Sequence, residues 1–318
     1  MVYKEGSIGS MVKQIQETLN VAIDGNFGPK TKAAVVNYQM NNNLVADGIV
    51  GRKTLDIMGI LDTDLKQVGS FHTGNGLNIL IDHLPKGEYM QNEAPILNDY
   101  IFIHHTAGWH NPHKTIASWG RDTRGRIATE FVMGGQSIKG NDDRYDGVTV
   151  QAFPEGCQGW HLGATKDYYM NRHSVGIELC SFGYSDSFSV LEDSEATEKA
   201  NAGTLTEEGK TYVGGQADES QIVELAELFQ GYAKWHKYSE KQINNLRKLL
   251  IYIASRDNID LQEGLVQWIH KMGAIKAFGF QQDACEGKIK GLLTHTNVRK
   301  GKSDCFPQQE LIDMLLSL

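Results

Sequence analysis

The stretch Tyr100–Gly108, with the sequence YIFIHHTAG, is an apolar run that ends in two histidines and a turn of small residues. Such a run predicts a buried β-strand that delivers an imidazole at its end, which is a common way to present a metal ligand. Taken alone it is weak evidence, because ordinary hydrogen bonds satisfy most buried histidines. His104 is therefore a candidate ligand that needs partners, and we expect His105 to be structural.

Other segments of the chain supply possible partners. Residues 125–135 and 147–153 are expected strands bounded by glycines, and Ser174–Leu179, SVGIEL, is a strand with one carboxylate inside an apolar run. That carboxylate, Glu178, is costly to bury unless it has a partner or a task. The segment WHLG, residues 160–163, places a further histidine, His161, beside the bulky aromatic Trp160.

The last segment of this kind lies near the C-terminus. Leu292–Val298 reads as a strand that carries His295, and Cys305 follows ten residues later with Lys302 and Asp304 beside it. Two histidines and one cysteine or aspartate form three zinc ligands with a fourth position open, which is the layout of a catalytic zinc site.

An open position on zinc has a specific chemical use. It lowers the pKa of a bound water towards neutrality and so creates a nucleophile for amide hydrolysis. A nearby carboxylate such as Glu178 can take the proton of this water and pass it to the leaving amine. A cation or imidazole such as Lys302 or His161 can stabilise the developing oxyanion.

The N-terminal part carries an internal repeat. Asp24–Thr31, DGNFGPKT, is echoed 23 residues later by Asp47–Thr54, DGIVGRKT. Each copy predicts a tight turn followed by a helix start, with the hydroxyl of Thr31 or Thr54 as a helix cap. Apolar residues at helical spacing complete a compact three-helix unit. Because it holds no acid–base pair, we interpret it as a binding module.

These motifs carry two family resemblances. The repeat resembles the peptidoglycan-binding-1 family over about residues 8–59. IHHTAG, WHLG, SVGIEL and the segment from His295 to Cys305, in this order, resemble the zinc-dependent N-acetylmuramoyl-L-alanine amidases over about residues 96–318. The combination resembles a modular phage endolysin, and it implies a Zn²⁺ cofactor and bacterial peptidoglycan as the partner.

The resemblance also implies roles for single residues. His104 matches the first zinc ligand and His295 the second. The third ligand of the family is either Asp or Cys; we expect Cys305 here, with Asp304 as the open alternative. Lys302 matches the catalytic cation, and Glu178 matches the catalytic carboxylate.

Three more residues complete the expected site. His161 is expected to assist catalysis, and Trp160 to contact the substrate. Glu130 stands where many relatives carry histidine, so we place it near the zinc as a substrate contact and leave its role open.

The expected fold class is α+β. We predict a helical module at residues 1–60, a linker at 61–95 and an α/β catalytic domain at 96–318, with a mixed central sheet flanked by helices. An acidic insertion at about 185–220, rich in small and polar residues, interrupts this domain. The function expected is hydrolysis of the lactyl–L-alanine amide bond; the alternatives are a bacterial autolysin or recycling amidase, or a non-catalytic peptidoglycan receptor.

The composition of the chain argues against two further classes of function. The 318 residues are 40% apolar, carry a formal net charge of −8 and have a pI near 5.8, which argues against a nucleic-acid binder. No run of about 18 apolar residues occurs, so no membrane insertion is expected. The helical spacing of 222–235 and 246–253 indicates core packing. We expect a monomer, made in the host cytoplasm without a signal peptide and reaching the wall through a membrane lesion.

Overall fold

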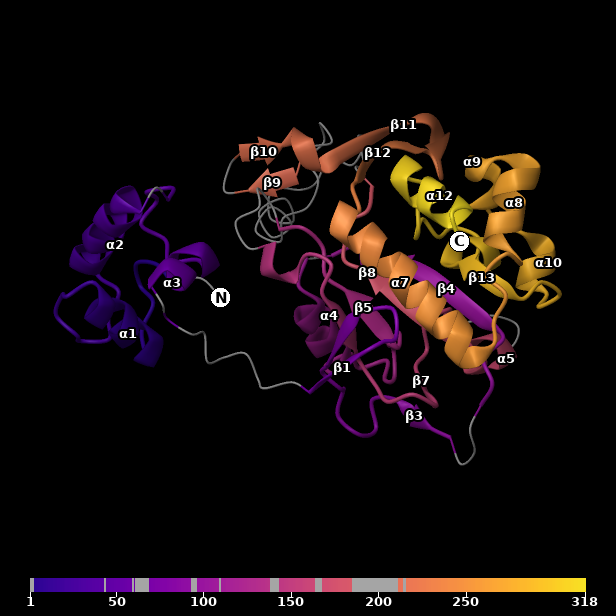
Figure 1. Cartoon of the computed structure of the whole chain (residues 1–318), viewed down its shortest axis with the longest axis horizontal. Coiled ribbons are helices and arrows are strands. Elements are labelled where there is room, and N and C mark those ends of the chain that lie inside the picture. Colours follow the sequence, from indigo (N-terminus) through magenta and orange to yellow (C-terminus); the bar gives the residue numbers. More distant parts are fainter. Residues whose placement is uncertain are drawn as a thin grey trace. The chain divides into compact units, whose positions relative to one another are not determined.

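The computed structural model describes residues 3–42, 44–58, 60, 69–92, 96–108, 110–137, 143–163, 168–184, 211–213 and 216–318. The chain divides into two compact units (Figure 1). Unit 1 comprises Met1–Gln67, with Gly140–Arg144 grouped to it, and unit 2 comprises Val68–Lys139 and Tyr145–Leu318. Most of the acidic insertion expected at 185–220 lies outside the described residues.

Unit 1 is built from three helices and its own apolar core. The helices are α1 (Ser10–Thr18), α2 (Pro29–Asn41) and α3 (Arg52–Met58). Pro29 occupies the first turn of α2, where its missing N–H costs nothing. The core contains Val12, Ile15, Phe27, Val35, Val50 and Leu55.

The repeat is visible as a duplicated hydrogen-bond network. The amide of Gln16 donates to the Asp24 carboxylate, the Asn26 carbonyl and Thr31 Oγ1, and its oxygen accepts from the Gly25 N–H. Gln39, 23 residues later, makes the same four contacts with the second copy. The threonine hydroxyl thus accepts from a glutamine side chain in each copy, in place of the helix-capping contact that we expected.

Unit 2 is organised around a seven-stranded sheet of order β1-β2-β6-β5-β8-β4-β13. Strands β5, β8, β4 and β13 are parallel neighbours, whereas β5 pairs with β6 and β1 with β2 in antiparallel fashion. The sheet is therefore mixed, as predicted. Its strands are β1 (Ser70–His72), β2 (Asn78–Ile81), β4 (Tyr100–His105), β5 (Phe131–Met133), β6 (Thr149–Gln151), β8 (Ser174–Leu179) and β13 (Gly291–Thr294).

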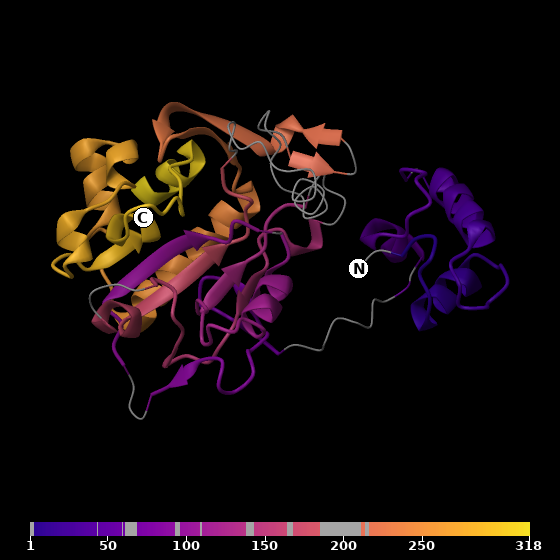
Figure 2. The same cartoon turned by 180° about the vertical axis from the view of Figure 1, so that it is seen from behind.

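Helices cover this sheet. The long helix α7 (Glu240–Asp257) lies across one face, as Figures 1 and 2 show from opposite sides. It begins with a capping box, in which Ser239 and Gln242 bond each other's backbone N–H. Arg256 near its end lies over the Phe131 ring. On the other face α4 (Pro112–Trp119) packs its Ile116 in one apolar cluster with Val132 of β5.

The remaining elements are short. The helices are α5 (Tyr168–Arg172), α8 (Leu265–Met272), α9 (Ala274–Ala277), α10 (Gln282–Cys285), α11 (His295–Val298) and α12 (Gln309–Leu316). Three two-stranded sheets pair β3 (Met90–Gln91) with β7 (Cys157–Gln158), β9 (Thr211–Val213) with β10 (Gln216–Asp218), and β11 (Ile222–Phe229) with β12 (Tyr232–His236).

Two expectations about the fold need correction. The segment 222–235 is a β-hairpin, not a helix, whereas 246–253 does lie within α7. The segment 61–95 was expected to be a linker, but its part from residue 69 to 92 carries three strands, of which β1 and β2 belong to the central sheet. These strands supply one edge of unit 2.

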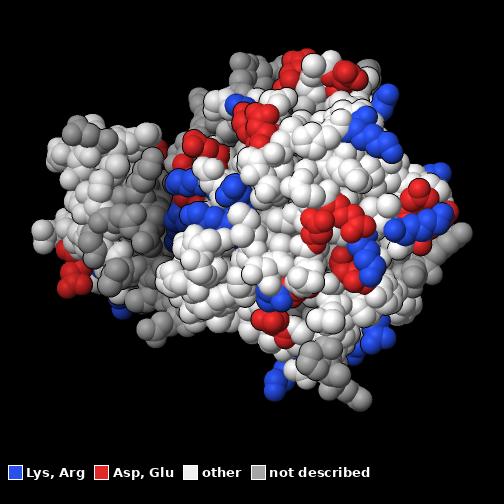
Figure 3. Space-filling view, turned by 45° about the vertical axis from the view of Figure 1, so that its right-hand side comes forward, with Lys and Arg blue, Asp and Glu red and all other residues white. Residues whose placement is uncertain are grey.

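The described surface is mixed in charge. On the face shown in Figure 3, most of the surface is uncharged, and acidic and basic side chains lie in small separate groups. Among the described residues, no helix is long and apolar enough to cross a membrane. All four cysteines are free thiols.

Candidate metal centre and active site

Three neighbouring parallel strands deliver the candidate residues to one edge of the sheet. In β4 and β8, His104 pairs with Glu178, so their side chains share a face. In β13, Thr294 pairs with Ile103, which places the next residue, His295, beside His104. His295 is the first residue of α11, not a strand residue as expected, and a capping box between Thr294 and Asn297 turns the chain there.

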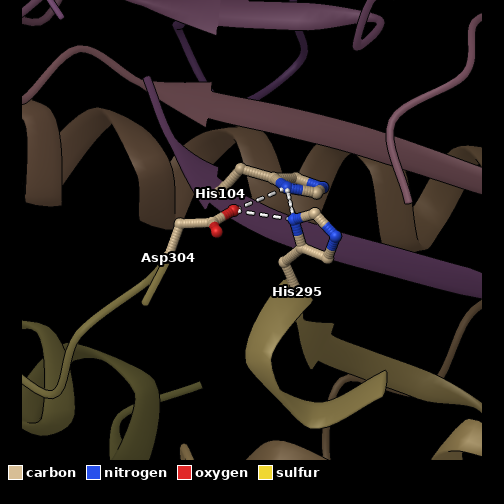
Figure 4. A group of neighbouring side chains, drawn as sticks. All are labelled: His104, His295 and Asp304. Carbon is tan, nitrogen blue, oxygen red and sulfur yellow. Dashed lines mark hydrogen bonds and ion pairs between the residues drawn. The ribbon is translucent and has the colours of Figure 1, made fainter. Parts of the chain in front are cut away.

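His104, His295 and Asp304 form a compact cluster (Figure 4). Nδ1 of His104 lies 3.2 Å from Nδ1 of His295. Oδ2 of Asp304 lies 3.0 Å from the first of these nitrogens and 2.9 Å from the second. Asp304 comes from the loop after α11, and a backbone hydrogen bond from the Thr296 N–H to its carbonyl fixes this loop.

This donor set fits zinc. Ligand atoms about 2.0–2.1 Å from a tetrahedral zinc ion lie about 3.3 Å from one another, close to the spacing of these three atoms. Burial lowers the pKa of His104 to about 4, so the imidazole is neutral, as a metal ligand must be. Burial opposes ionisation of Asp304, but hydrogen bonds with His104 and His295 outweigh it and hold its pKa below the usual range.

Cys305, the third ligand that we expected, is not part of the cluster. Its thiol is buried and points to the carbonyl of Phe306, with Sγ 3.8 Å from the oxygen. Burial raises the pKa of this thiol to about 12, which disfavours the thiolate that zinc would require. Asp304, the alternative left open by the sequence, stands in the cluster with the two histidines instead.

Glu178 lies next to the cluster, and one of its carboxyl oxygens makes no hydrogen bond in the described part of the chain. This atom, Oε2, is buried. Burial raises the pKa of this carboxyl well above its usual value, the charge of Asp304 raises it further, and the charge of Lys302 lowers it. The geometry thus leaves a buried carboxyl oxygen without a hydrogen bond next to the three residues of the cluster.

Lys302 contributes positive charge at the same place. Its charge lowers the pKa of both Glu178 and His104, which puts the ammonium group within electrostatic range of the site. It is partly exposed. A cation within this range can stabilise negative charge that develops on a substrate oxygen.

His161 supports His104. Its Nδ1 lies 2.9 Å from Nε2 of His104, and its Nε2 lies 2.8 Å from Oγ of Ser174. Both ring nitrogens are therefore engaged, and none is left to bind an oxyanion. Gly176 makes this possible, because a Cβ atom there would lie 2.6 Å from the Thr129 side chain and 3.0 Å from the His161 ring.

Glu130 is not in the metal site. Its two carboxylate oxygens accept hydrogen bonds from Arg256 of α7 at 2.7 and 3.1 Å, and one of them also accepts from Gln151. Asp257 completes this buried ion-pair network by accepting from the same guanidinium. The expected contact with substrate is therefore replaced by a structural link between β5 and α7.

Two residues that contact the histidines of this region, Ser174 and Tyr238, could not be identified from the sequence. Ser174 opens the strand of Glu178, yet its hydroxyl meets His161 in a different segment. Tyr238 bonds both His105 and the Phe306 N–H, and so ties β4 to the loop that carries Asp304. This contact gives His105 the structural role that we expected. Trp160 is half-buried and stacks edge-on against Tyr168.

Comparison with known protein families shows which family the chain belongs to. The profile of the N-acetylmuramoyl-L-alanine amidase family matches residues 92–288, more than half of the chain. The chain belongs to the N-acetylmuramoyl-L-alanine amidase family. In the same chain, residues 9–58 match a peptidoglycan-binding domain family. His295 and Asp304 lie beyond the matched residues, and the geometry alone places them in the cluster.

Several known proteins resemble parts of this chain. The zinc D-Ala-D-Ala carboxypeptidase of Streptomyces albus G is 43% identical over 68 residues, which are 19% of this chain and 27% of that protein. The fused Zn-dependent amidase/peptidase/peptidoglycan-binding protein of Clostridium acetobutylicum is 39% identical over 22% of this chain and 34% of that one, with a TM-score of 0.19. The catalytic domain of XlyA is 16% identical, and the match covers 76% of this chain and 98% of that one, with a TM-score of 0.38. The chain thus spans about a quarter to a third of the length of the first two relatives.

Proposed function

We propose that this protein hydrolyses the amide bond between the lactyl group of N-acetylmuramic acid and L-alanine in peptidoglycan. The observation that carries the proposal is the cluster of His104, His295 and Asp304 with the unpartnered carboxylate of Glu178 beside it. Membership of the amidase family supports the choice of bond. A non-catalytic receptor would need neither this ligand set nor a buried carboxylate, so the enzyme is the better account.

The residues divide the chemical work among them. His104, His295 and Asp304 would hold zinc, which when bound acidifies water and polarises the substrate carbonyl. Glu178 accepts the proton of the attacking water on its free oxygen and then donates it to the nitrogen of L-alanine as the amide bond breaks. Its raised pKa suits this exchange, because the carboxyl can hold the proton between the two steps.

Lys302 acts on the charge of the reaction. As water adds, the carbonyl oxygen of the lactyl group becomes negative, and the ammonium group of Lys302 stabilises that charge. His161 keeps the ring of His104 in place and does not touch the substrate in this proposal. Trp160 is proposed to line the path of the substrate.

The architecture suggests a role in wall lysis. A wall-binding unit joined to an amidase holds the catalytic unit on an insoluble polymer, as a modular phage endolysin requires. We therefore propose an endolysin that works as a monomer on the host cell wall. Its test is the release of cell contents when purified protein is added to permeabilised bacteria.

Mass spectrometry of digested sacculi tests the reaction. The proposal predicts intact glycan strands and free stem peptides with a new amino group on L-alanine. Glu178→Gln should lower the turnover by about 10²–10⁴-fold, as expected for the loss of a general acid–base, without lowering zinc content. Cleaved glycan, or peptides cut at another bond, would refute the proposed reaction. A loss of turnover under threefold in Glu178→Gln would refute the role of this carboxylate.

A further inference from the structure

The two consecutive histidines of β4 point to opposite faces of the sheet. His104 points into the metal cluster, and side chains alternate along a strand, so His105 points the other way. His105 is 5% exposed, and Oη of Tyr238, between β12 and α7, lies 2.9 Å from its Nδ1. The second histidine of the pair therefore belongs to a hydrogen-bond system of its own.

This system reaches the loop that carries Asp304. The hydroxyl oxygen of Tyr238 accepts a hydrogen bond from the Phe306 N–H, with 3.3 Å between the two atoms. Tyr238 also stacks on the Phe306 ring, and Trp235 of β12 does the same, with centroid distances of 4.6 and 4.7 Å. Phe306 is fully buried by these contacts. The chain is thus held two residues after Asp304.

A second pair of hydrogen bonds fixes Tyr238 to the same loop. The backbone N–H of Tyr238 donates to Oε1 of Gln308 at 2.8 Å, and Nε2 of Gln308 donates to the Tyr238 carbonyl at 3.0 Å. Gln308 is 2% exposed, so water does not compete for these bonds. The hydroxyl and the backbone of one tyrosine therefore both bind the segment that follows Asp304.

Asp304 depends on such support more than His104 does. Asp304 reaches the cluster from a loop, whereas His104 stands on a strand (Figure 4). The ring of His104 is held from behind by His161. In the described part of the chain, the carboxylate of Asp304 makes hydrogen bonds only with His104 and His295, the other members of the cluster. Its direction therefore follows from where the backbone of its loop is held.

We propose that Tyr238 and His105 are positioning residues of the metal site, which raise the affinity for zinc by holding the loop of Asp304 against β4. Neither residue binds the metal. A loop that is already held in the binding geometry does not have to be ordered by the ion, so binding is more favourable. The inference rests on the ligand set of the proposed function, and it does not depend on which bond the enzyme cuts.

Tyr238→Phe is the first test, because it removes one oxygen atom and keeps the ring that stacks on Phe306. We expect the Kd for zinc, measured by competition with a chelator, to rise about 10-fold, as is typical when a partner behind a metal ligand is lost. Tyr100→Phe is the matched control. It removes a buried hydroxyl that donates to the Gly287 carbonyl at the other end of β4, so zinc affinity should stay within about twofold of wild type.

A double-mutant cycle separates positioning from a general loss of stability. Asp304→Ala leaves two imidazoles, which bind zinc weakly. In this background Tyr238→Phe should change the Kd by less than about twofold, because the loop no longer carries a ligand. In a His161→Phe background it should keep its effect of about 10-fold, since His161 holds His104 by a separate route. A residue that only stabilised the fold would have the same effect in both backgrounds.

Two substitutions of His105 complete the test. Asn places a polar atom near the position of Nδ1, so His105→Asn should bind zinc within about threefold of wild type, whereas His105→Leu should lose about 10-fold. Unchanged zinc affinity in Tyr238→Phe, or a loss that persists in the Asp304→Ala background, would overturn the inference and leave the ligand set intact. Wild-type zinc affinity in Asp304→Ala alone would instead refute the ligand set, and the inference with it.

Discussion

At the scale of single residues, His104 is held from both sides of its ring. Nδ1 faces the other two ligand atoms, and Nε2 meets His161, whose far nitrogen meets Ser174. The Ser174 hydroxyl lies 3.5 Å from the Asn171 carbonyl, to which it donates, so its oxygen accepts from His161. Each proton then points away from the cluster, which leaves the lone pair on Nδ1 of His104 for the metal.

This chain of donors predicts a graded loss of metal affinity. Ser174→Ala should weaken zinc binding by about 10-fold and His161→Phe by about 10- to 100-fold, because the orientation of the ligand ring is no longer fixed. Competition with a chelator measures both constants without any assay of activity. His270→Gln, which changes an exposed histidine outside the site, should bind zinc like the wild-type protein. Unchanged affinity in His161→Phe would mean that His161 does not position His104.

The sequence could identify some of these residues but not others. His104, Glu178 and His295 were predictable, because each is a polar side chain within or just after an apolar run. The choice between Asp304 and Cys305 was not, since neighbouring residues in a loop differ only in the direction each side chain takes. Glu130 pairs with Arg256, which lies far from it in the sequence. No local sequence pattern predicts such a pair.

At the scale of elements, the duplicated glutamine of unit 1 carries a stability prediction. Gln39 is 2% exposed and makes four hydrogen bonds to the second turn, so Gln39→Ala leaves several buried polar groups without partners. We expect the free energy of unfolding of unit 1 to fall by about 2–4 kcal/mol. Gln16→Ala should cost a similar amount, because its network is the same.

Chemical denaturation of residues 1–67, which contain their own apolar core, measures these changes. Gln14→Ala is the matched control, because Gln14 lies on the exposed side of α1 and its loss should change stability by less than about 0.5 kcal/mol. If Gln39→Ala and Gln14→Ala were equally stable, the duplicated network would have no energetic role. The repeat would then conserve only the path of the backbone.

The elements themselves were predictable to different degrees. The strands 100–105 and 174–179 agree with the expected ranges, because parallel strands buried on both faces are short continuous apolar runs. The hairpin β11–β12 was not predictable from the spacing of its apolar residues. Its register shifts between Glu224 and Phe229, and such an irregularity breaks the alternation of apolar residues that marks a strand. The spacing left in the sequence then resembles that of a helix.

At the scale of the whole molecule, unit 1 should matter for where the enzyme works and not for how it works. Residues 68–318 contain every residue of the metal cluster, so this part alone should bind zinc and cut soluble muramyl peptides at nearly the full-length rate. On intact sacculi it should be slower, because tethering raises the effective substrate concentration. The difference should shrink as the enzyme concentration increases.

Sedimentation with purified sacculi supplies the complementary measurement. Residues 1–67 alone should sediment with the sacculi and release no amino groups. If they stayed in solution, and if their removal left the activity on sacculi unchanged, unit 1 would not be a wall-binding module of this protein.

The central claim is that two imidazoles and the carboxylate of Asp304 hold zinc at the ends of neighbouring strands. X-ray absorption at the zinc edge of the zinc-loaded protein tests it most directly, because sulfur and oxygen or nitrogen ligands differ in distance. The geometry predicts only nitrogen and oxygen ligands at about 2.0–2.2 Å, unchanged in Cys305→Ser and disturbed in Asp304→Asn. A sulfur ligand at about 2.3 Å that disappears in Cys305→Ser would contradict the account.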